Sequence, residues 1–337
     1  MAGYRVAILG ATGMVGREFI KILEQRKFPV SDLVLLASDR SAGRTMTFGS
    51  QEIVVQETSP HSFKGIDIVL ASAGAEISLE FSPMAAEAGA VVIDNSRAFR
   101  MDPDVPLVVP EVNLEDARNH HGIIANPNCS TIQMVVALNP IHLVSPIRRV
   151  IVDTYQSVSG TGTPAVEEVE RQSSAVLARE QVDPRVYPHQ IAFNVLPHIE
   201  PFREDGYSRE EWKMLEETRK IMHVPGILVS ATTVRVPVMI GHAEAIHIET
   251  ERPMTPAEVR EILSSAPGVI VQDDPRSDVY PTPAEIAGRN EVFVGRIRKD
   301  ISHPNGIAMW VVADNIRKGA ALNAVQIAEV LIERGWL

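Results

Sequence analysis

Short apolar runs alternate with amphipathic stretches over the first 128 residues of the chain. The runs are continuous and rich in Val, Ile and Leu, as is typical of parallel strands covered on both faces. They are Val6–Leu9, Leu33–Ala37, Ile68–Ala71, Val91–Ile93, Leu107–Val109 and Ile123–Ala125. Between the first two runs, apolar residues recur at helical spacing, at Val15, Phe19, Ile22 and Leu23. This order of strands and helices predicts a doubly wound α/β domain of the Rossmann type.

The pattern changes after residue 128, where the apolar runs lengthen and several alternate with polar residues. Few helices separate the strands predicted there, which favours an α+β domain with a mixed, largely antiparallel sheet. These strands are Val150–Tyr155, Val229–Val236, Ala243–Glu249, Val292–Arg298 and Ala308–Val312. The length of 337 residues also suggests two domains, since single cores stop growing at roughly 250–300 residues.

Helix starts are marked at three places after residue 128. Thr163-Pro164 predicts an N-cap followed by proline, and capping boxes are predicted at Ser208 with Glu211 and at Thr255 with Glu258. Residues 319–334 form a last apolar helix, which we expect to pack on the first domain. The predicted domains are therefore 1–128 with the C-terminal helix 315–337, and 129–314.

Composition and charge exclude several classes of protein. Hydrophobic residues make up 45% of the chain, so a large core is possible, and the net charge of −11 argues against nucleic acid or an anionic membrane surface as a partner. No apolar run reaches the roughly 20 residues that span a bilayer, and the N-terminal sequence lacks a secretory pattern. The single cysteine excludes a paired-cysteine zinc site, and no metal site is predicted. We expect a cytoplasmic protein.

A glycine-rich loop follows the first predicted strand and opens the first predicted helix. It comprises Gly10, Ala11, Thr12, Gly13, Met14, Val15 and Gly16. A strand, a glycine turn and a helix in this order are typical of dinucleotide binding, because the turn lets the backbone approach the pyrophosphate at a helix N-terminus. A glycine-rich turn without a ligand is the alternative.

The end of the second predicted strand bears on the choice between NAD and NADP. An acidic residue there would bind the ribose hydroxyl of NAD, and Asp39 could do so. Arg40 and Arg44 offer positive charge, and Ser38 and Ser41 offer hydroxyl groups, for the 2′-phosphate of NADP. NADP is therefore favoured, with a solvated polar loop as the alternative.

Cys129 is the only cysteine, and it lies in Asn126-Pro127-Asn128-Cys129-Ser130-Thr131, ahead of an apolar helical stretch. A thiol at a helix N-terminus has a lowered pKa, because the positive end of the helix dipole favours the thiolate. A small buried apolar residue is the other explanation, since free cysteines are often buried. This segment alone leaves packing and catalysis open.

Further segments carry a narrower resemblance. They are Tyr155-Gln156-Ser157-Val158-Ser159-Gly160-Thr161-Gly162, Glu210-Glu211-Trp212-Lys213-Met214, Arg235-Val236-Pro237 with Gly241-His242, and Ala313-Asp314-Asn315-Ile316-Arg317-Lys318-Gly319-Ala320-Ala321. With the glycine loop and the cysteine segment, they make the whole chain similar to bacterial aspartate-β-semialdehyde dehydrogenases. That family reduces β-aspartyl phosphate with NADPH, releasing inorganic phosphate, on the route to lysine, methionine, threonine and diaminopimelate.

The resemblance implies roles for individual residues. Cys129 would be the nucleophile that forms a thioester, Gln156 would orient the intermediate, and His242 would be the acid/base. The substrate-binding residues implied are Arg235 for the α-carboxylate, Glu210 for the ammonium group, Arg100 and Lys213 for phosphate, and Asn128. The cofactor-binding residues implied are the glycine loop 10–16, Ser38, Arg40, Ser41, Ser72, Ala73, Gly74, Ser159, Gly160 and Asn315. The resemblance also implies that residues 129–314 bind substrate and form a homodimer, with a tetramer as the alternative.

Residue chemistry supports part of this assignment independently. Glu210 and Lys213 lie three residues apart and share a helix face, although an ordinary surface ion pair would show the same spacing. Arg235 can grip a carboxylate with two parallel hydrogen bonds, and a salt bridge at a strand end is its alternative. Arg97 departs from the family pattern, which has a small residue there, so two nearby arginines compete for the phosphate role and Arg100 is preferred.

Three other functions are compatible with parts of the pattern. N-acetyl-γ-glutamyl-phosphate reductase uses the same thioester chemistry on a substrate whose amine is blocked, which would leave Glu210 without a purpose. Glyceraldehyde-phosphate dehydrogenase is disfavoured because Arg235 and Glu210 suit an amino acid better than a sugar phosphate. A non-catalytic NADP-binding protein would have no need of Cys129 and His242 together.

Overall fold

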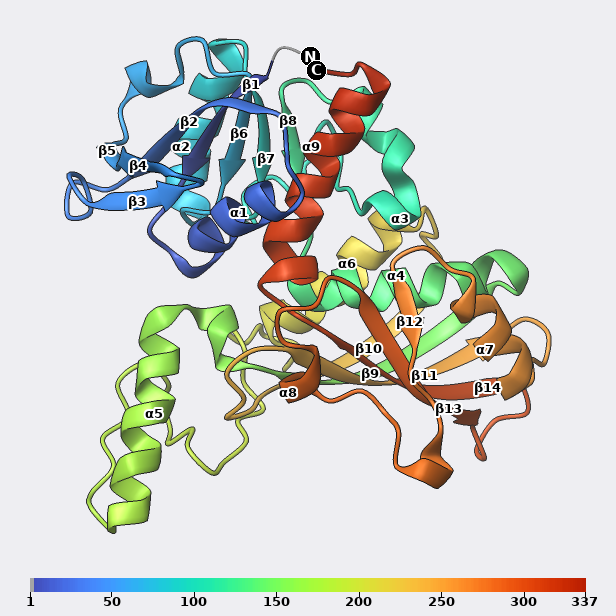
Figure 1. Ribbon diagram of the computed structural model, residues 1–337. Helices are drawn as coiled ribbons and strands as arrows, with labels where there is room; N and C mark the ends of the chain where they lie inside the picture. The colour runs from blue at the N-terminus through green and yellow to red at the C-terminus, as the bar shows by residue number, and fades with distance from the viewer. Residues whose placement is uncertain (1–2) are drawn as a thin grey trace. The chain divides into compact units, whose positions relative to one another are not determined.

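The computed structural model describes residues 3–337, which divide into two compact units (Figure 1). Unit 1 comprises residues 1–128 and 320–337, and unit 2 comprises residues 129–319. The chain thus leaves unit 1 immediately before the cysteine and returns for its last helix.

Unit 1 is built on a six-stranded parallel sheet with the strand order β5-β2-β1-β6-β7-β8. The strands are β1 Tyr4–Leu9, β2 Val30–Ala37, β5 Gln56–Glu57, β6 Ile68–Ala71, β7 Val91–Asp94 and β8 Ile123–Ala125. Their apolar residues are buried because helices cover both faces, as the continuous runs predicted. The Rossmann-type α/β prediction is confirmed.

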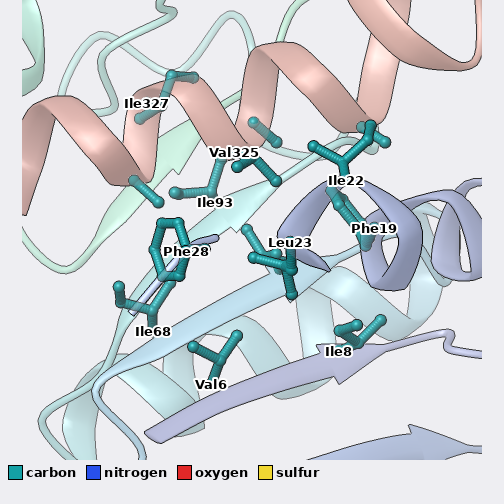
Figure 2. Close-up of a cluster of buried hydrophobic side chains, with 14 of the residues drawn as sticks. Val6, Ile8, Phe19, Ile22, Leu23, Phe28, Ile68, Ile93, Val325 and Ile327 are labelled. Carbon is teal, nitrogen blue, oxygen red and sulfur yellow. The ribbon is translucent and has the colours of Figure 1, made fainter. Parts of the chain in front are cut away.

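Helices α1 (Met14–Gln25) and α9 (Leu322–Arg334) pack on one face of this sheet. Figure 2 shows the resulting core, in which Phe19 and Leu23 from α1 meet Val325 and Ile327 from α9 above the sheet residue Ile93. Helix α2 (Ala75–Glu87) covers the other face. Residues from both ends of the chain therefore share one core, and the expected packing of the last helix on the first domain is observed.

One predicted strand is wrong. Residues 107–109 form no strand, and Leu107 makes only an isolated bridge to Ala125. The run lies between Pro106 and Pro110, which lack amide donors, and the amide of Val109 donates to the Asn113 side chain at 2.9 Å. Helix α3 (Pro110–Asn113) and the short helix η2 (Leu114–Asn119) begin there instead. The hairpin of β3 (Thr45–Phe48) and β4 (Gln51–Val54) and the short helix η1 (Pro60–Phe63) were not predicted.

Unit 2 contains a mixed six-stranded sheet with the order β10-β9-β11-β14-β13-β12. The strands are β9 Ile147–Gln156, β10 Leu228–Arg235, β11 His242–Thr250, β12 Val269–Val271, β13 Val292–Lys299 and β14 Gly306–Ala313. The pairs β9–β11, β11–β14 and β13–β14 are antiparallel, whereas β9–β10 and β12–β13 are parallel. The predicted mixed, largely antiparallel sheet is confirmed, with β12 as an unpredicted edge strand.

Helices α4 (Cys129–Val144), α6 (Arg209–Ile221) and α7 (Pro256–Ser264) cover one face of this sheet. Both capping boxes are confirmed, at Ser208 with Glu211 and at Thr255 with Glu258. Helix α5 (Thr163–Ala178) is also confirmed, but its N-cap is Gly162 rather than Thr163, because the backbone there has a φ of 99° that favours glycine. The short helices η3 (Val158–Thr161), η4 (Pro275–Ser277), α8 (Pro283–Ile286) and the π-helical turn η5 (Arg317–Ala321) complete the unit and lead into α9.

The opposite face of the sheet is only partly covered, by residues near α8. Along β9 and β11 its side chains remain accessible, including Asp153, Ala245 and His247. Tyr155 is 40% exposed, and its ring lies 5.4 Å from that of Trp310. A partly covered sheet face with accessible aromatic side chains is typical of an interaction surface.

Candidate active site

Cys129 is the first residue of α4, so its thiol lies at the positive end of a buried 16-residue helix. This position favours the thiolate form. The side chain is half-buried and packs against the turn at Gly319, where an added Cβ would lie 2.9 Å from the Cys129 Cβ. Only glycine allows that turn to approach the cysteine so closely. The same turn carries Asn315, whose Cβ lies 3.6 Å from the added atom.

His242 is the first residue of β11 and is fully buried. Its Nδ1 accepts a hydrogen bond from the Ser157 amide at 3.0 Å, and the Ser157 hydroxyl lies 3.1 Å from the same nitrogen. A neutral ring that accepts at Nδ1 carries its proton at Nε2, and Nε2 has no hydrogen-bond partner among the described residues. Burial, and secondly the charge of Arg235, lower the pKa of His242 to about 3. The ring is therefore neutral at physiological pH and presents one N–H to a ligand.

The side chain of Asn315 holds the loop around His242 through three hydrogen bonds. Its Oδ1 accepts hydrogen bonds from the Gly241 amide at 2.8 Å and the Ser157 hydroxyl at 3.0 Å, while its Nδ2 donates to Ser159 Oγ at 2.9 Å. One amide thus joins the residue before His242 to the two serines of the loop after β9. Asn315 and Ser159 were predicted to bind the cofactor, and here their side chains hold His242 in place. Cys129 and His242 are connected through this turn.

Arg235 ends β10 with 5% of its surface exposed, and its Nη1 donates to the Ser157 carbonyl oxygen at 2.7 Å. Its buried Nε has no hydrogen-bond partner in the described part of the chain. A buried donor without a partner is costly, so a ligand that accepts from it is favoured. A Cβ added at Gly160 would lie 3.1 Å from Arg235 Nη1 and 3.4 Å from the His242 ring, so Gly160 leaves room for both.

The predicted pair on α6 forms part of a buried polar cluster rather than a surface ion pair. Lys213 Nζ lies 3.0 Å from Glu210 Oε2, and the two side chains are 16% and 5% exposed. Gln156 donates through Nε2 to Glu210 Oε1 at 3.0 Å and accepts from the Thr154 hydroxyl at 3.1 Å. Lys213 also contacts Glu200, at 2.5 Å. The cluster joins the end of β9 to the first turn of α6.

Arg100 and Arg97, both in unit 1, differ in their surroundings. Arg100 is 8% exposed, and it donates to the carbonyl oxygens of Asn126 at 3.0 Å and Asn95 at 2.9 Å. Arg97 is exposed. Arg100 is therefore fixed against the backbone that leads to Asn128, itself buried.

The carboxylate at the end of β7 shapes the loop that carries Arg100. Asp94 is fully buried, and it accepts hydrogen bonds from Ser78 and from both the amide and the hydroxyl of Ser96. Burial raises the pKa of Asp94, and the hydrogen bonds from Ser96 and Ser78 oppose that rise. Asp94 thus fixes the start of the 95–100 loop.

The glycine loop of unit 1 fits a dinucleotide. Gly10 has a φ of 88°, and a Cβ there would lie 2.5 Å from the Ser72 carbonyl oxygen. At Gly16 an added Cβ would lie 2.3 Å from the Gly10 carbonyl oxygen, so this glycine lets α1 pack closely on the turn. At Gly13 an added Cβ would lie 3.4 Å from the Gly10 carbonyl oxygen, so this position is less crowded. The first amides of α1 follow it, and a helix N-terminus favours a phosphate.

Two further loops lie beside the glycine loop. Thr12 Oγ1 lies 3.3 Å from Ser41 Oγ, which brings the end of β2 to the glycine turn, and Ser38 and Arg40 are exposed there. The segment Ser72-Ala73-Gly74 follows β6, and Gly74 (φ 89°) caps α2. The predicted cofactor residues of unit 1 therefore gather at the carboxyl ends of β1, β2 and β6, where such folds bind ligands.

Sequence reasoning missed three residues in or near this site. Ser157 has no role that the sequence indicates, although its amide donates a hydrogen bond to His242. Glu200 was not noticed, because nothing in its neighbourhood indicates a contact with Lys213. Glu244 could have been noticed, since it falls on the inward-facing positions of β11, two residues after His242.

Comparison with known proteins places this geometry in a family. The family model for the semialdehyde dehydrogenase NAD binding domain matches residues 5–120, and that for the semialdehyde dehydrogenase dimerisation domain matches residues 138–318. The aspartate-semialdehyde dehydrogenase of Aquifex aeolicus is 60% identical, over 99% of this chain and 100% of that relative. The chain belongs to the aspartate-semialdehyde dehydrogenase family. It is therefore an enzyme, an oxidoreductase with a nicotinamide-dinucleotide domain, and the resemblance found in its motifs is confirmed.

Solved structures of the family share the fold. The crystal structure of aspartate semialdehyde dehydrogenase II from Vibrio cholerae complexed with ASA has a TM-score of 0.96 and 48% identity, covering 99% of both chains. The aspartate semialdehyde dehydrogenase of Candida albicans, solved with NADP, has a TM-score of 0.78 and 28% identity, covering 99% of this chain and 100% of that one. No described helix of the present chain is long and apolar enough to cross a membrane.

Proposed function

We propose that this enzyme is an NADP-dependent aspartate-β-semialdehyde dehydrogenase, which converts L-4-aspartyl phosphate to L-aspartate 4-semialdehyde and inorganic phosphate. The observation that supports this proposal best is the buried Arg235. Its Nε has no partner among the residues that the structure describes, and its Nη1 contacts the same Ser157 that orients His242. A hydrogen-bond donor for a carboxylate is thereby tied to a proton donor and, through Asn315, to the turn that contacts Cys129. Family membership supports the same substrate class.

The chemistry is simplest in the oxidative direction. The Cys129 thiolate attacks the aldehyde carbon, the C–S bond forms, and the carbonyl π electrons move to oxygen. The Nε2–H of His242 donates a hydrogen bond to that oxygen as its negative charge develops. A bound dinucleotide would supply the hydride acceptor, and loss of hydride from the same carbon would leave a thioester on Cys129. A phosphate oxygen then attacks the thioester carbon, and the thiolate departs as the acyl phosphate forms.

The remaining residues bind and orient the substrate. Arg235 holds the α-carboxylate, Glu210 the ammonium group, and Gln156, fixed between Thr154 and Glu210, orients the intermediate. Arg100 and Lys213 bind phosphate, and Asn128 contacts the substrate beside Cys129.

The cofactor and the pathway follow from the same proposal. The exposed Arg40, with Ser38 and Ser41 beside the glycine loop, supports NADP as the cofactor, as does the Candida albicans relative solved with NADP. The product serves amino-acid biosynthesis toward lysine (through diaminopimelate), methionine and threonine.

We also propose that the enzyme is a homodimer, formed through the partly covered face of the unit 2 sheet around Tyr155 and Trp310. The match of this unit to a dimerisation-domain model supports the proposal. Light scattering should give the mass of two chains, and a charge placed in the face, such as Ala245→Glu, should reduce it to one. An unchanged dimer in that variant would place the interface elsewhere.

One assay tests the activity directly. NADP reduction is followed with aspartate semialdehyde or N-acetylglutamate semialdehyde, each with and without inorganic phosphate. We expect phosphate-dependent turnover of the first substrate only. Preference for the acetylated substrate would identify the N-acetyl-γ-glutamyl-phosphate reductase activity instead, and turnover without phosphate would contradict the proposed thioester step.

A further inference from the structure

Glu200 lies in the loop before α6 with its backbone in the left-handed region, at a φ of 63°. Residues other than glycine, asparagine and aspartate seldom adopt this conformation, and where they do the surrounding structure must hold them there. Its carboxylate Oε1 lies 2.5 Å from Lys213 Nζ. The left-handed backbone of Glu200 therefore occurs together with an ion pair to Lys213, which belongs to the polar cluster around Glu210.

Lys213 is shared between two carboxylates. Its Nζ lies 3.0 Å from Glu210 Oε2 as well as 2.5 Å from Glu200 Oε1. The side chains are 5% exposed for Glu210, 16% for Lys213 and 27% for Glu200. Water screens interactions among such partly buried charges less than it does at a surface.

The charge balance of these three residues bears on substrate binding. Glu210 and Lys213 alone would form a neutral pair, which gives a substrate ammonium group no net charge to bind. With Glu200 the three side chains carry a charge of −1, which is complementary to one ammonium group. Gln156, the fourth member of the cluster, is uncharged and contacts Glu210 Oε1.

We propose that Glu200 is a specificity-determining residue that acts through Lys213: it balances the lysine charge, so that Glu210 keeps a net negative charge for the substrate ammonium group. The inference rests on the proposed function. Glu200 is a positioning residue in this scheme, since the substrate contact belongs to Glu210.

The test compares two aldehydes at saturating phosphate and NADP. Aspartate semialdehyde carries the ammonium group, and succinate semialdehyde has the same carbon skeleton without it. In Glu200→Gln, the preference for aspartate semialdehyde, as the ratio of the two kcat/KM values, should fall roughly tenfold. The change should appear as a higher KM for aspartate semialdehyde, with kcat nearly unchanged. KM for phosphate should not rise, because one fewer carboxylate then competes with phosphate for Lys213.

Three further variants separate electrostatics from structure. Glu204→Gln removes the same charge from an exposed position of the same loop and should leave the preference unchanged. Glu200→Asp should retain most of the preference. Adding Lys213→Met to Glu200→Gln returns the cluster to −1, so the preference should recover even though phosphate binding weakens.

The outcomes distinguish this inference from the proposed function. A wild-type enzyme that does not prefer aspartate semialdehyde would overturn both. A wild type that does prefer it, with Glu200→Gln showing the same preference or losing activity equally on both aldehydes, would overturn the role of Glu200 alone. Failure of the double variant to recover any preference would likewise contradict the charge-balance argument.

Discussion

Glu244 is a buried carboxyl group with no role in the proposed chemistry. It is the third residue of β11, two residues after His242, and both of its side-chain oxygens are buried with no hydrogen-bond partner among the described residues. It faces Gln133, one turn beyond Cys129 on α4. Burial raises the pKa of Glu244 well above its usual value, and the Gln133 amide opposes the rise only in part. We therefore expect Glu244 to remain protonated in the folded enzyme.

This protonation makes stability depend on pH with a definite sign. The ordinary pKa of the group is 4.5, so above that pH the unfolded chain releases the proton while the folded enzyme retains it. The free energy of unfolding should then fall by up to about 1.4 kcal/mol for each pH unit in which the folded protein keeps the proton. The contribution is fully present below the unfolded pKa and is lost as pH rises toward the folded one.

Glu244→Gln removes the titration while keeping the size and a neutral polar group. The variant should match the wild type near pH 5 and become progressively more stable than it toward pH 8. Urea unfolding followed by tryptophan fluorescence, at fixed protein concentration and half-unit pH steps, measures the difference. Glu261→Gln, at an exposed position of α7, is the matched control and should run parallel to the wild type. Parallel curves for Glu244→Gln itself would refute the argument, because they would mean that Glu244 ionises in the folded state.

The residues proposed for catalysis and substrate binding give three more predictions. Cys129→Ser should lose nearly all turnover yet bind NADPH in a fluorescence titration as the wild type does, and substantial turnover would remove the thioester from the mechanism. Arg235→Lys should raise KM for aspartate semialdehyde about tenfold, because one ammonium cannot replace a bidentate guanidinium. An unchanged KM would mean that Arg235 does not bind the substrate carboxylate. His242, with a pKa of about 3, should show no imidazole titration between pH 5 and 8 in NMR spectra of the ligand-free enzyme, and a transition near pH 6.5 would contradict its burial.

The fold could be predicted wherever a local pattern decides it. Continuous apolar runs required two covered faces, and the structure supplies α1 and α9 on one side and α2 on the other. The run at 107–109 has the same composition as a strand but lies between two prolines. Val108 still donates to Ala125 of β8, whereas the Val109 amide donates to the Asn113 side chain. Its failure as a strand depends on hydrogen bonds to Asn113, which composition does not reveal.

The candidate site was predictable to a different extent at each residue. Cys129 could be predicted because it is the only cysteine in the sequence and lies at a helix start. Ser157 and Asn315 act through hydrogen bonds to His242 and Gly241, more than 70 residues away in sequence, so no local pattern indicates them. Glu200 depends on a left-handed backbone and a contact formed only when its loop folds against α6.

Glu210 shows how a structural motif can distinguish between two adjacent candidate residues. The sequence has two adjacent glutamates after Ser208, and either could face the substrate. Glu211 forms the capping box, because its Oε2 accepts a hydrogen bond from the Ser208 amide at 2.7 Å. This contact fixes which side of the helix Glu211 faces. Glu210 and Lys213 then face inward together, and their side chains are 5% and 16% exposed. The residue proposed to bind the substrate ammonium group at the start of α6 is thus selected by the one that caps the helix, because neighbouring side chains point roughly 100° apart around a helix axis and cannot both face inward.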